Sequence, residues 1–199
     1  MPKLPILFFI IYALVIGILI ISILKEDVTE PRQPNAEAGE IVTTYRNIPI
    51  YSNGSDYTKS HGKHYADQGY YYGQKWQCVE FVKRFYHDAF NHQMPSVWGH
   101  AKDFYKFDIP HGSLNSERGM LPFENGGNMK PRPDDLLVFN SSAFGHVAVI
   151  SAVRDGEIEV VQQNIAGSPR QIHPLIYKDG RYLIGSLRKP IGWLRLQTP

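Results

Sequence analysis

The sequence has little cysteine, because Cys78 is the only one in 199 residues. A single cysteine excludes an intrachain disulfide and a metal site built from several cysteines, and it leaves the redox compartment open. The chain also lacks an excess of charge: its formal net charge is +2, and no run of Lys or Arg occurs. Nucleic acid is therefore not an expected partner.

Internal repeats and low-complexity segments are absent as well. Hydrophobic residues at 43% and charged residues at 20% are typical of an ordinary globular chain with one core. His61 and His64 have a spacing that metal ligands can show, but two histidines without further ligands favour solvent-facing loop positions. We expect no metal and no cofactor.

One long apolar run is present. Leu4–Leu24 is free of charged residues and lies between Lys3 and Lys25. As a helix it would be about 31 Å long, which is enough to cross a bilayer. No small-x-small cleavage site follows it, so residues 1–25 predict an uncleaved transmembrane anchor. The short N-terminal tail favours a single-pass protein of the bacterial inner membrane with its C-terminal domain outside the cytoplasm.

Residues 26–40 are polar, contain two prolines and predict a flexible linker. The remainder, 41–199, predicts one domain. Ile41–Tyr51 is expected to be a first strand, Val97–Phe107 a short helix, and the C-terminal third a series of antiparallel strands. The fold class expected from this order is α+β.

The stretch from Tyr70 to Phe90 contains Cys78 and then an apolar stripe with helical spacing: Phe81, Val82, Phe85 and Ala89. The helix should begin near Gln77, with Cys78 in its first turn, where unpaired N–H groups favour a thiolate. Polar residues such as Glu80 and Arg84 should lie on the helix surface as a supporting pair. Cys78 is a candidate nucleophile, and a small buried hydrophobic residue is the equally open alternative.

A second informative stretch is His146–Val153, which predicts a strand that pairs with Glu157–Gln163. A two-residue Asp155-Gly156 loop and a three-residue loop give pairings that differ by one residue. We favour the three-residue loop, because it places His146, Gln162 and Asn164 on one face with an apolar middle. Side-chain amides beside an imidazole can fix its tautomer, although a lone His is more often a surface residue.

The strings Gly73-Gln74-Lys75-Trp76-Gln77-Cys78-Val79-Glu80-Phe81 and Gly145-His146-Val147-Ala148-Val149-Ile150 resemble the CHAP amidohydrolase/peptidase family, in particular the amidase half of bifunctional glutathionylspermidine synthetase/amidase. The resemblance covers about Ile41 to Trp193. It implies a papain-like α+β fold, with the cysteine on the helix and the histidine on the sheet. It also implies that Cys78 is the nucleophile and His146 its base.

The resemblance further assigns a third catalytic position, which is acidic in this branch of the family and is Gln162 here. Asn164 remains the alternative third member. The family's Arg-Arg pair becomes Lys83-Arg84, so Lys83 is a candidate for substrate binding. The backbone N–H of Cys78 is the expected first oxyanion donor, and Gln77 or Gln74 the second.

Two classes of function follow. The first is a membrane-anchored cysteine amidase or peptidase that cleaves peptidoglycan peptides or a glutathionylspermidine-like amide. The second is a membrane-tethered binding module that kept the fold and lost turnover, because Gln162 replaces an acid. The chain has no room for the ATP-dependent synthetase half, and the oligomeric state is left open by the sequence.

Overall fold

The computed structural model describes residues 36–185 and 189–197. The elements are β1 (Ile41–Tyr45), β2 (Ile48–Tyr51), β3 (Lys63–Tyr65), β4 (Tyr71–Gln74), α2 (Cys78–Phe90), the 3-10 helix η1 (Ala101–Phe104), β5 (Met120–Glu124), β6 (Leu136–Phe139), β7 (His146–Arg154), β8 (Glu157–Val161), β9 (Arg170–Lys178), β10 (Arg181–Ile184) and β11 (Gly192–Leu196).

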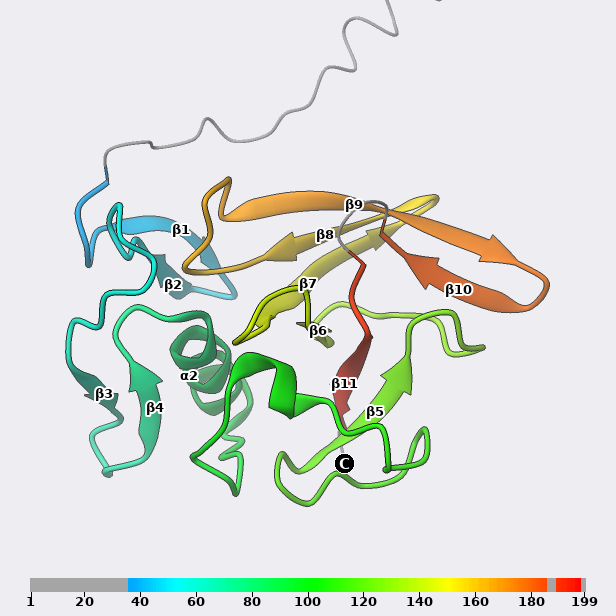
Figure 1. The fold of residues 1–199 in the computed structure, drawn as a ribbon, viewed down its shortest axis with the longest axis horizontal. Coiled ribbons are helices and arrows are strands. Elements are labelled where there is room, and N and C mark those ends of the chain that lie inside the picture. Colours follow the sequence, from blue (N-terminus) through cyan, green and yellow to red (C-terminus); the bar gives the residue numbers. More distant parts are fainter. Residues whose placement is uncertain (1–35, 186–188, 198–199) are drawn as a thin grey trace, which may run out of the picture. The chain divides into compact units, whose positions relative to one another are not determined.

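Most of these strands form one antiparallel sheet of seven strands in the order β10-β9-β8-β7-β6-β11-β5 (Figure 1). Strands β6 and β7 lie in its interior, and all of β6 and the first five residues of β7 are buried. Strand β11 comes from the C-terminal end of the chain and inserts between β6 and β5. Two separate hairpins, β1–β2 and β3–β4, stand beside α2.

Helix α2 forms where the apolar spacing predicted it. Phe81 and Phe85 are fully buried and share one core cluster with Val147 of β7, so the apolar stripe faces the sheet. The helix ends at Asn91, whose left-handed backbone (φ 51°) allows its N–H to donate to the carbonyl of His87. The sequence therefore placed this element correctly.

The prediction that the polar side chains of α2 lie on its surface is wrong. Glu80, Lys83 and Arg84 are 0%, 1% and 4% exposed. The two hairpins cover this side of the helix: Arg84 donates to the carbonyl of Pro49, and Lys83 to that of Tyr71. Because each of these polar groups has a hydrogen-bond partner, its burial is tolerated.

The predicted α+β fold class is also wrong, because the described residues are mostly β and contain a single α-helix. The helix expected at Val97–Phe107 is only the 3-10 turn η1, which begins after Gly99. Strands β3, β4 and β5 were not among the predicted elements. The single strand expected at Ile41–Tyr51 is a hairpin, because Arg46 and Asn47 adopt positive φ (49° and 63°) without a glycine to mark the turn.

The predictions of a transmembrane helix and of an inner-membrane location are corrected by a further finding. Within residues 36–185 and 189–197, no helix is both long enough and apolar enough to cross a bilayer. Helix α2 has 13 residues and carries buried charges, whereas a span needs about 20 apolar residues. The stretch on which the prediction was based, Leu4–Leu24, lies outside the described residues.

The β7–β8 hairpin has the predicted pairing near His146, but a shorter turn and a β-bulge produce it. Arg154 pairs with Glu157, so the turn is the two-residue Asp155-Gly156 loop. A β-bulge at Ser151 then shifts the register by one residue, and Ile150 pairs with Val160. The shared face is therefore confirmed for His146 and Gln162 but not for Asn164, and the three-residue loop is wrong.

Candidate active site

Cys78 is the first residue of α2 and is 9% exposed. It packs in the core cluster between the helix and β7, and a hydrogen bond from the backbone of Val147 reaches its thiol. Burial raises the pKa of this thiol, and backbone hydrogen bonds from Val147, Val79 and Cys78 itself oppose that rise without reversing it. The helix start therefore does not by itself produce a thiolate, contrary to the expectation from the sequence.

His146 is the first residue of β7 and is also 9% exposed. Gly145 before it has φ 72°, and an added Cβ would lie 2.6 Å from both the Lys102 nitrogen and the Phe139 oxygen. Only glycine fits this close approach of η1 to the strand. Because His146 directly precedes Val147, whose backbone bonds to Cys78, the starts of β7 and α2 meet at this point.

Gln162 lies just after β8 and is 2% exposed. Its Oε1 is 3.0 Å from Nε2 of His146. Its amide nitrogen donates to the carbonyl of Ser168 (3.3 Å) and to Oε1 of Gln171 (3.2 Å). A reversed amide would direct its oxygen at the Ser168 carbonyl, so the orientation of the Gln162 amide is fixed. An amide oxygen only accepts, and Nε2 of His146 is therefore the protonated nitrogen.

Asn164 does not share this contact. Its backbone is left-handed (φ 59°), and its amide nitrogen donates to the carbonyl of Tyr57 (2.9 Å) and to Oε1 of Gln77. The amide nitrogen of Gln77 in turn donates to the carbonyls of Lys59 (3.0 Å) and Tyr57 (3.3 Å). Asn164 and Gln77 thus hold the segment before β3 against the start of α2.

The other two predicted site residues lie on the β4 side of α2. Gln74, the last residue of β4, accepts a hydrogen bond from Ser60 at 2.6 Å. The ammonium of Lys83 lies 4.8 Å from the ring centre of Tyr70 and is buried. Burial lowers the pKa of Lys83 to about 8, with a smaller contribution from the charge of Arg118. The structure does not place Lys83 beside His146 or Cys78.

Sequence reasoning missed the residue that follows Gln162. Gln163 is 1% exposed, and its amide nitrogen donates to the carboxylate of Glu80 at 2.6 Å. Glu80 also accepts from Arg84 (2.6 Å) and contacts Nδ1 of His64 (2.8 Å). Burial acts to raise the pKa of Glu80, but hydrogen bonds from His64, Arg84 and Gln163 and the charge of Arg84 outweigh it and lower this pKa. The i,i+4 spacing of Glu80 and Arg84 was the available signal.

The histidines considered as metal ligands have other partners. Nε2 of His61 lies 3.3 Å from the carbonyl oxygen of Asn53, and His64 contacts Glu80. In the part of the chain that the structure describes, no group of three or more His, Cys, Asp or Glu side chains is arranged to hold a metal ion.

Comparison with known proteins gives similar proteins and a family match. The chain is similar to trypanothione synthetase of Crithidia fasciculata, with 29% identity over 161 residues, which cover 74% of this chain and 24% of that protein. It is similar to bifunctional glutathionylspermidine synthetase/amidase of Escherichia coli K12, with 29% identity over 137 residues, which cover 61% of this chain and 21% of the relative. The chain thus spans about a quarter of the length of these relatives.

Residues 69–164 match the CHAP domain family. This match confirms the resemblance to the CHAP family that was drawn from the sequence. The matched segment includes Cys78, His146 and Gln162.

Proposed function

We propose that the chain hydrolyses an amide bond of a peptide-like substrate, with Cys78 as nucleophile and His146 as general base. The observation that carries this proposal is the hydrogen bond from Nε2 of His146 to Gln162. With the proton on Nε2, the lone pair of a neutral imidazole lies on Nδ1, and the proposal assigns to this nitrogen the role of accepting the thiol proton. The backbone contact between Val147 and the Cys78 thiol supports the pairing, because it brings the nucleophile to the start of β7.

Burial raises the pKa of Cys78, so in this proposal the thiol reacts quickly only because His146 accepts its proton. His146 takes the thiol proton as the sulfur attacks the amide carbonyl carbon, and a tetrahedral oxyanion forms. The imidazolium then gives its proton to the departing amine as the C–N bond breaks, which leaves a thioester. Neutral His146 next removes a proton from water as the water oxygen bonds to the thioester carbonyl carbon. The C–S bond then breaks, the carboxylic acid leaves, and the imidazolium returns its proton to the sulfur of Cys78.

The oxyanion needs hydrogen-bond donors that are in place before the reaction. The backbone N–H of Cys78, in the first turn of α2, is the first donor in this proposal. Gln77 is a poor second donor, because both hydrogens of its amide nitrogen point at the Lys59 and Tyr57 carbonyls. Gln74 uses its amide nitrogen for a hydrogen bond that acts to lower the pKa of Tyr71, which leaves it a second hydrogen. We therefore assign the second donor to Gln74.

For the substrate we propose a glutathionylspermidine-like amide, in which a short peptide is joined through its carboxyl group to an amine. This choice is supported by the names of the relatives, glutathionylspermidine synthetase/amidase and trypanothione synthetase. Peptidoglycan peptides are the alternative substrate, and their amide chemistry is the same.

Alkylation by iodoacetamide at pH 7 tests the Cys78–His146 pair independently of the substrate. Wild-type Cys78 should react at least tenfold faster than free glutathione. His146→Ala should react more slowly than glutathione, because burial raises the pKa of the remaining thiol. Equal rates for wild type and His146→Ala would contradict the proposed pair. Amine release from glutathionylspermidine and from a peptidoglycan peptide then identifies the substrate.

A second candidate function is a binding module without turnover. It is supported by the raised pKa of Cys78 and by a neutral Gln162 where related enzymes are expected to carry an acid. A Cys78 that alkylates no faster than glutathione, together with retained binding of the uncleaved amide, would establish this alternative.

A further inference from the structure

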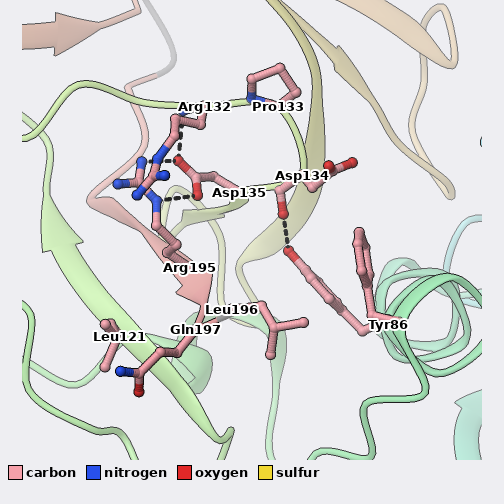
Figure 2. A pocket seen from close by; sticks show the side chains of 10 residues that line it. Tyr86, Leu121, Arg132, Pro133, Asp134, Asp135, Arg195, Leu196 and Gln197 are labelled. Carbon is pink, nitrogen blue, oxygen red and sulfur yellow. Dashed lines mark hydrogen bonds and ion pairs between the residues drawn. The ribbon is translucent and has the colours of Figure 1, made fainter. Parts of the chain in front are cut away.

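A pocket of about 260 Å³ lies at the C-terminal half of α2, away from Cys78 (Figure 2). Its lining comes from α2, β5, β11 and the loop before β6: Tyr86, Phe90, Leu121, Arg132, Pro133, Asp134, Asp135, Arg195, Leu196 and Gln197. Tyr86 follows Cys78 by eight residues on one helix, which corresponds to about 12 Å along its axis. None of the proposed catalytic residues lines this pocket, which we call the Arg195 pocket.

Arg195 is the buried cation of this pocket, and it is 7% exposed. Its Nε and Nη2 donate to the two carboxylate oxygens of Asp135 at 2.8 Å and 2.6 Å, and Nη2 also donates to the carbonyl of Lys130. Its Nη1 is buried and has no hydrogen-bond partner. A guanidinium nitrogen only donates, so Nη1 lacks an acceptor. An unsatisfied buried donor of this kind requires an explanation, and a bound acceptor is one.

The charged groups at and beside the pocket also carry a net positive charge. Asp134 is paired with Arg46 at 2.6 Å, and Asp135 with Arg195. Arg132 adds a third guanidinium, and within the described residues it takes part in no ion pair with Asp or Glu. Three positive and two negative charges leave one positive charge. A single carboxylate in the pocket would neutralise it by pairing with Arg132.

The opposite side of the pocket is apolar. The rings of Tyr86 and Phe90 and the side chains of Leu121 and Leu196 form it. The hydroxyl of Tyr86 donates to the carbonyl of Asp134, so it presents its ring rather than a free donor (Figure 2). A pocket with one cationic end and one apolar wall suits a ligand with the same two halves.

We propose that the Arg195 pocket binds a small monocarboxylate with an apolar tail, with the carboxylate on Arg195 and Arg132 and the tail against Leu196 and Phe90. A free organic acid and the C-terminal residue of a peptide share this chemistry. The site is independent of the hydrolase reaction, since it uses none of the catalytic residues.

Isothermal titration of the full chain with 3-methylbutanoate and with 3-methylbutanamide tests the proposal. The acid should bind with a stoichiometry of one, and the amide at least tenfold more weakly. Arg132→Gln should weaken acid binding about tenfold, which corresponds to one lost charge-assisted contact. Leu196→Trp should abolish binding by filling the apolar side. The matched control is Arg181→Gln, which removes an exposed positive charge on β10, outside the pocket, and should bind like wild type.

The proposal is overturned if the acid and the amide bind equally well, or if Leu196→Trp binds the acid like wild type. It is also overturned if neither the acid nor the peptide binds. An equal loss in Arg181→Gln and Arg132→Gln also overturns it, because attraction to net charge would then suffice. N-acetyl-glycyl-leucine distinguishes the two sources: tighter binding than 3-methylbutanoate assigns the pocket to a peptide C-terminus, and weaker binding to a free acid. Alkylation of Cys78 should be unchanged in all three variants, which separates this test from that of the hydrolase.

Discussion

Two consecutive glutamines at the end of β8 lead to networks of opposite character. Gln162 joins a network without formal charge at rest, in which its amide connects His146 to Ser168 and Gln171. Gln163 joins a charged network, in which its amide nitrogen meets Glu80 and its oxygen accepts from the backbone of Tyr51. The charged network fixes the start of α2 to its covering hairpins. The neutral network holds His146, which gains and loses a proton in the proposed mechanism.

A buried ion pair and a neutral amide contact suit different roles in this protein. A carboxylate and a guanidinium that satisfy one another resist any change of protonation, which suits a structural role. An imidazole held by a neutral amide keeps its orientation, and the amide does not stabilise one charge state as strongly as a carboxylate would. We therefore expect substitutions in the network of Gln162 to affect the rate, and substitutions in the network of Gln163 and Glu80 to affect the stability.

The largest effect is expected for Cys78→Ala, at the first residue of α2. Amide hydrolysis should fall to the uncatalysed background, because no other side chain in the mechanism can form the thioester. The measurement is amine release from glutathionylspermidine. Thermal unfolding should stay within a few degrees of wild type, since the change removes one small buried atom; a fully active Cys78→Ala protein would exclude the proposed mechanism.

Glu80→Gln should break the charged network. It leaves Arg84 buried without its counter-charge, and the free energy of unfolding should fall by about 3 kcal/mol. The folded-state pKa of Glu80 is lowered, so its stabilisation is present above the unfolded-state pKa of about 4.3 and is lost as the pH falls below that value. Urea unfolding at pH 7 and at pH 4 measures both effects.

A matched control for Glu80→Gln is Glu157→Gln, which removes an exposed partner of Arg154 at 3.2 Å. It should cost less than about 1 kcal/mol. Equal losses in the two variants, or a Glu80→Gln protein that keeps the acid sensitivity of wild type, would mean that the buried network is not the main electrostatic contribution to stability.

Gln162→Ala should lower kcat/KM by about a hundredfold, because the imidazole loses its positioning contact. Its stability should change less than that of Glu80→Gln. Gln162→Glu should keep activity and raise the pKa of His146 relative to wild type, so the acidic limb of the pH–rate profile, where protonation removes the base, should move to higher pH. If Gln162→Ala is silent and Asn164→Ala is strongly impaired, the third member is Asn164.

The smallest effect is expected for Gln171→Ala, which removes one of the two acceptors that orient the Gln162 amide. We expect a loss of about tenfold or less in kcat, with KM unchanged, because the carbonyl of Ser168 remains. Gln171→Glu keeps an acceptor at the same place and should restore the rate. Loss of activity in both variants with a lowered unfolding temperature would indicate a structural role only.

Local patterns predicted the parts of this molecule that depend on local sequence. The stripe that includes Phe81 and Phe85 predicted α2, and the alternation after His146 predicted β7 and the face it shares with Val160. The position of Gln162 came from the family resemblance. Its hydrogen bond to His146 is present, and its catalytic role remains a prediction.

Contacts between distant segments were not predictable in the same way. The periodicity identified Glu80 and Arg84 as the polar side of α2, but only the β1–β2 and β3–β4 hairpins make that side interior. The pairing of Arg195 with Asp135 joins segments 60 residues apart and has no local signal. The β-bulge at Ser151 was missed for a related reason, since the register depends on how the whole sheet pairs.

That bulge divides the β7–β8 hairpin into two parts whose strand registers differ by one residue. Ser151 is anchored by its hydroxyl on Glu159 (2.6 Å), and its carbonyl accepts from Tyr45. The register at the His146 end is therefore set at Ser151 and not at the Asp155-Gly156 turn. A protein engineer could insert a reporter peptide at that turn without moving His146, and deleting Ser151, the extra residue of the bulge, should leave Ile150 opposite Val160 and the imidazole on the same face of the sheet.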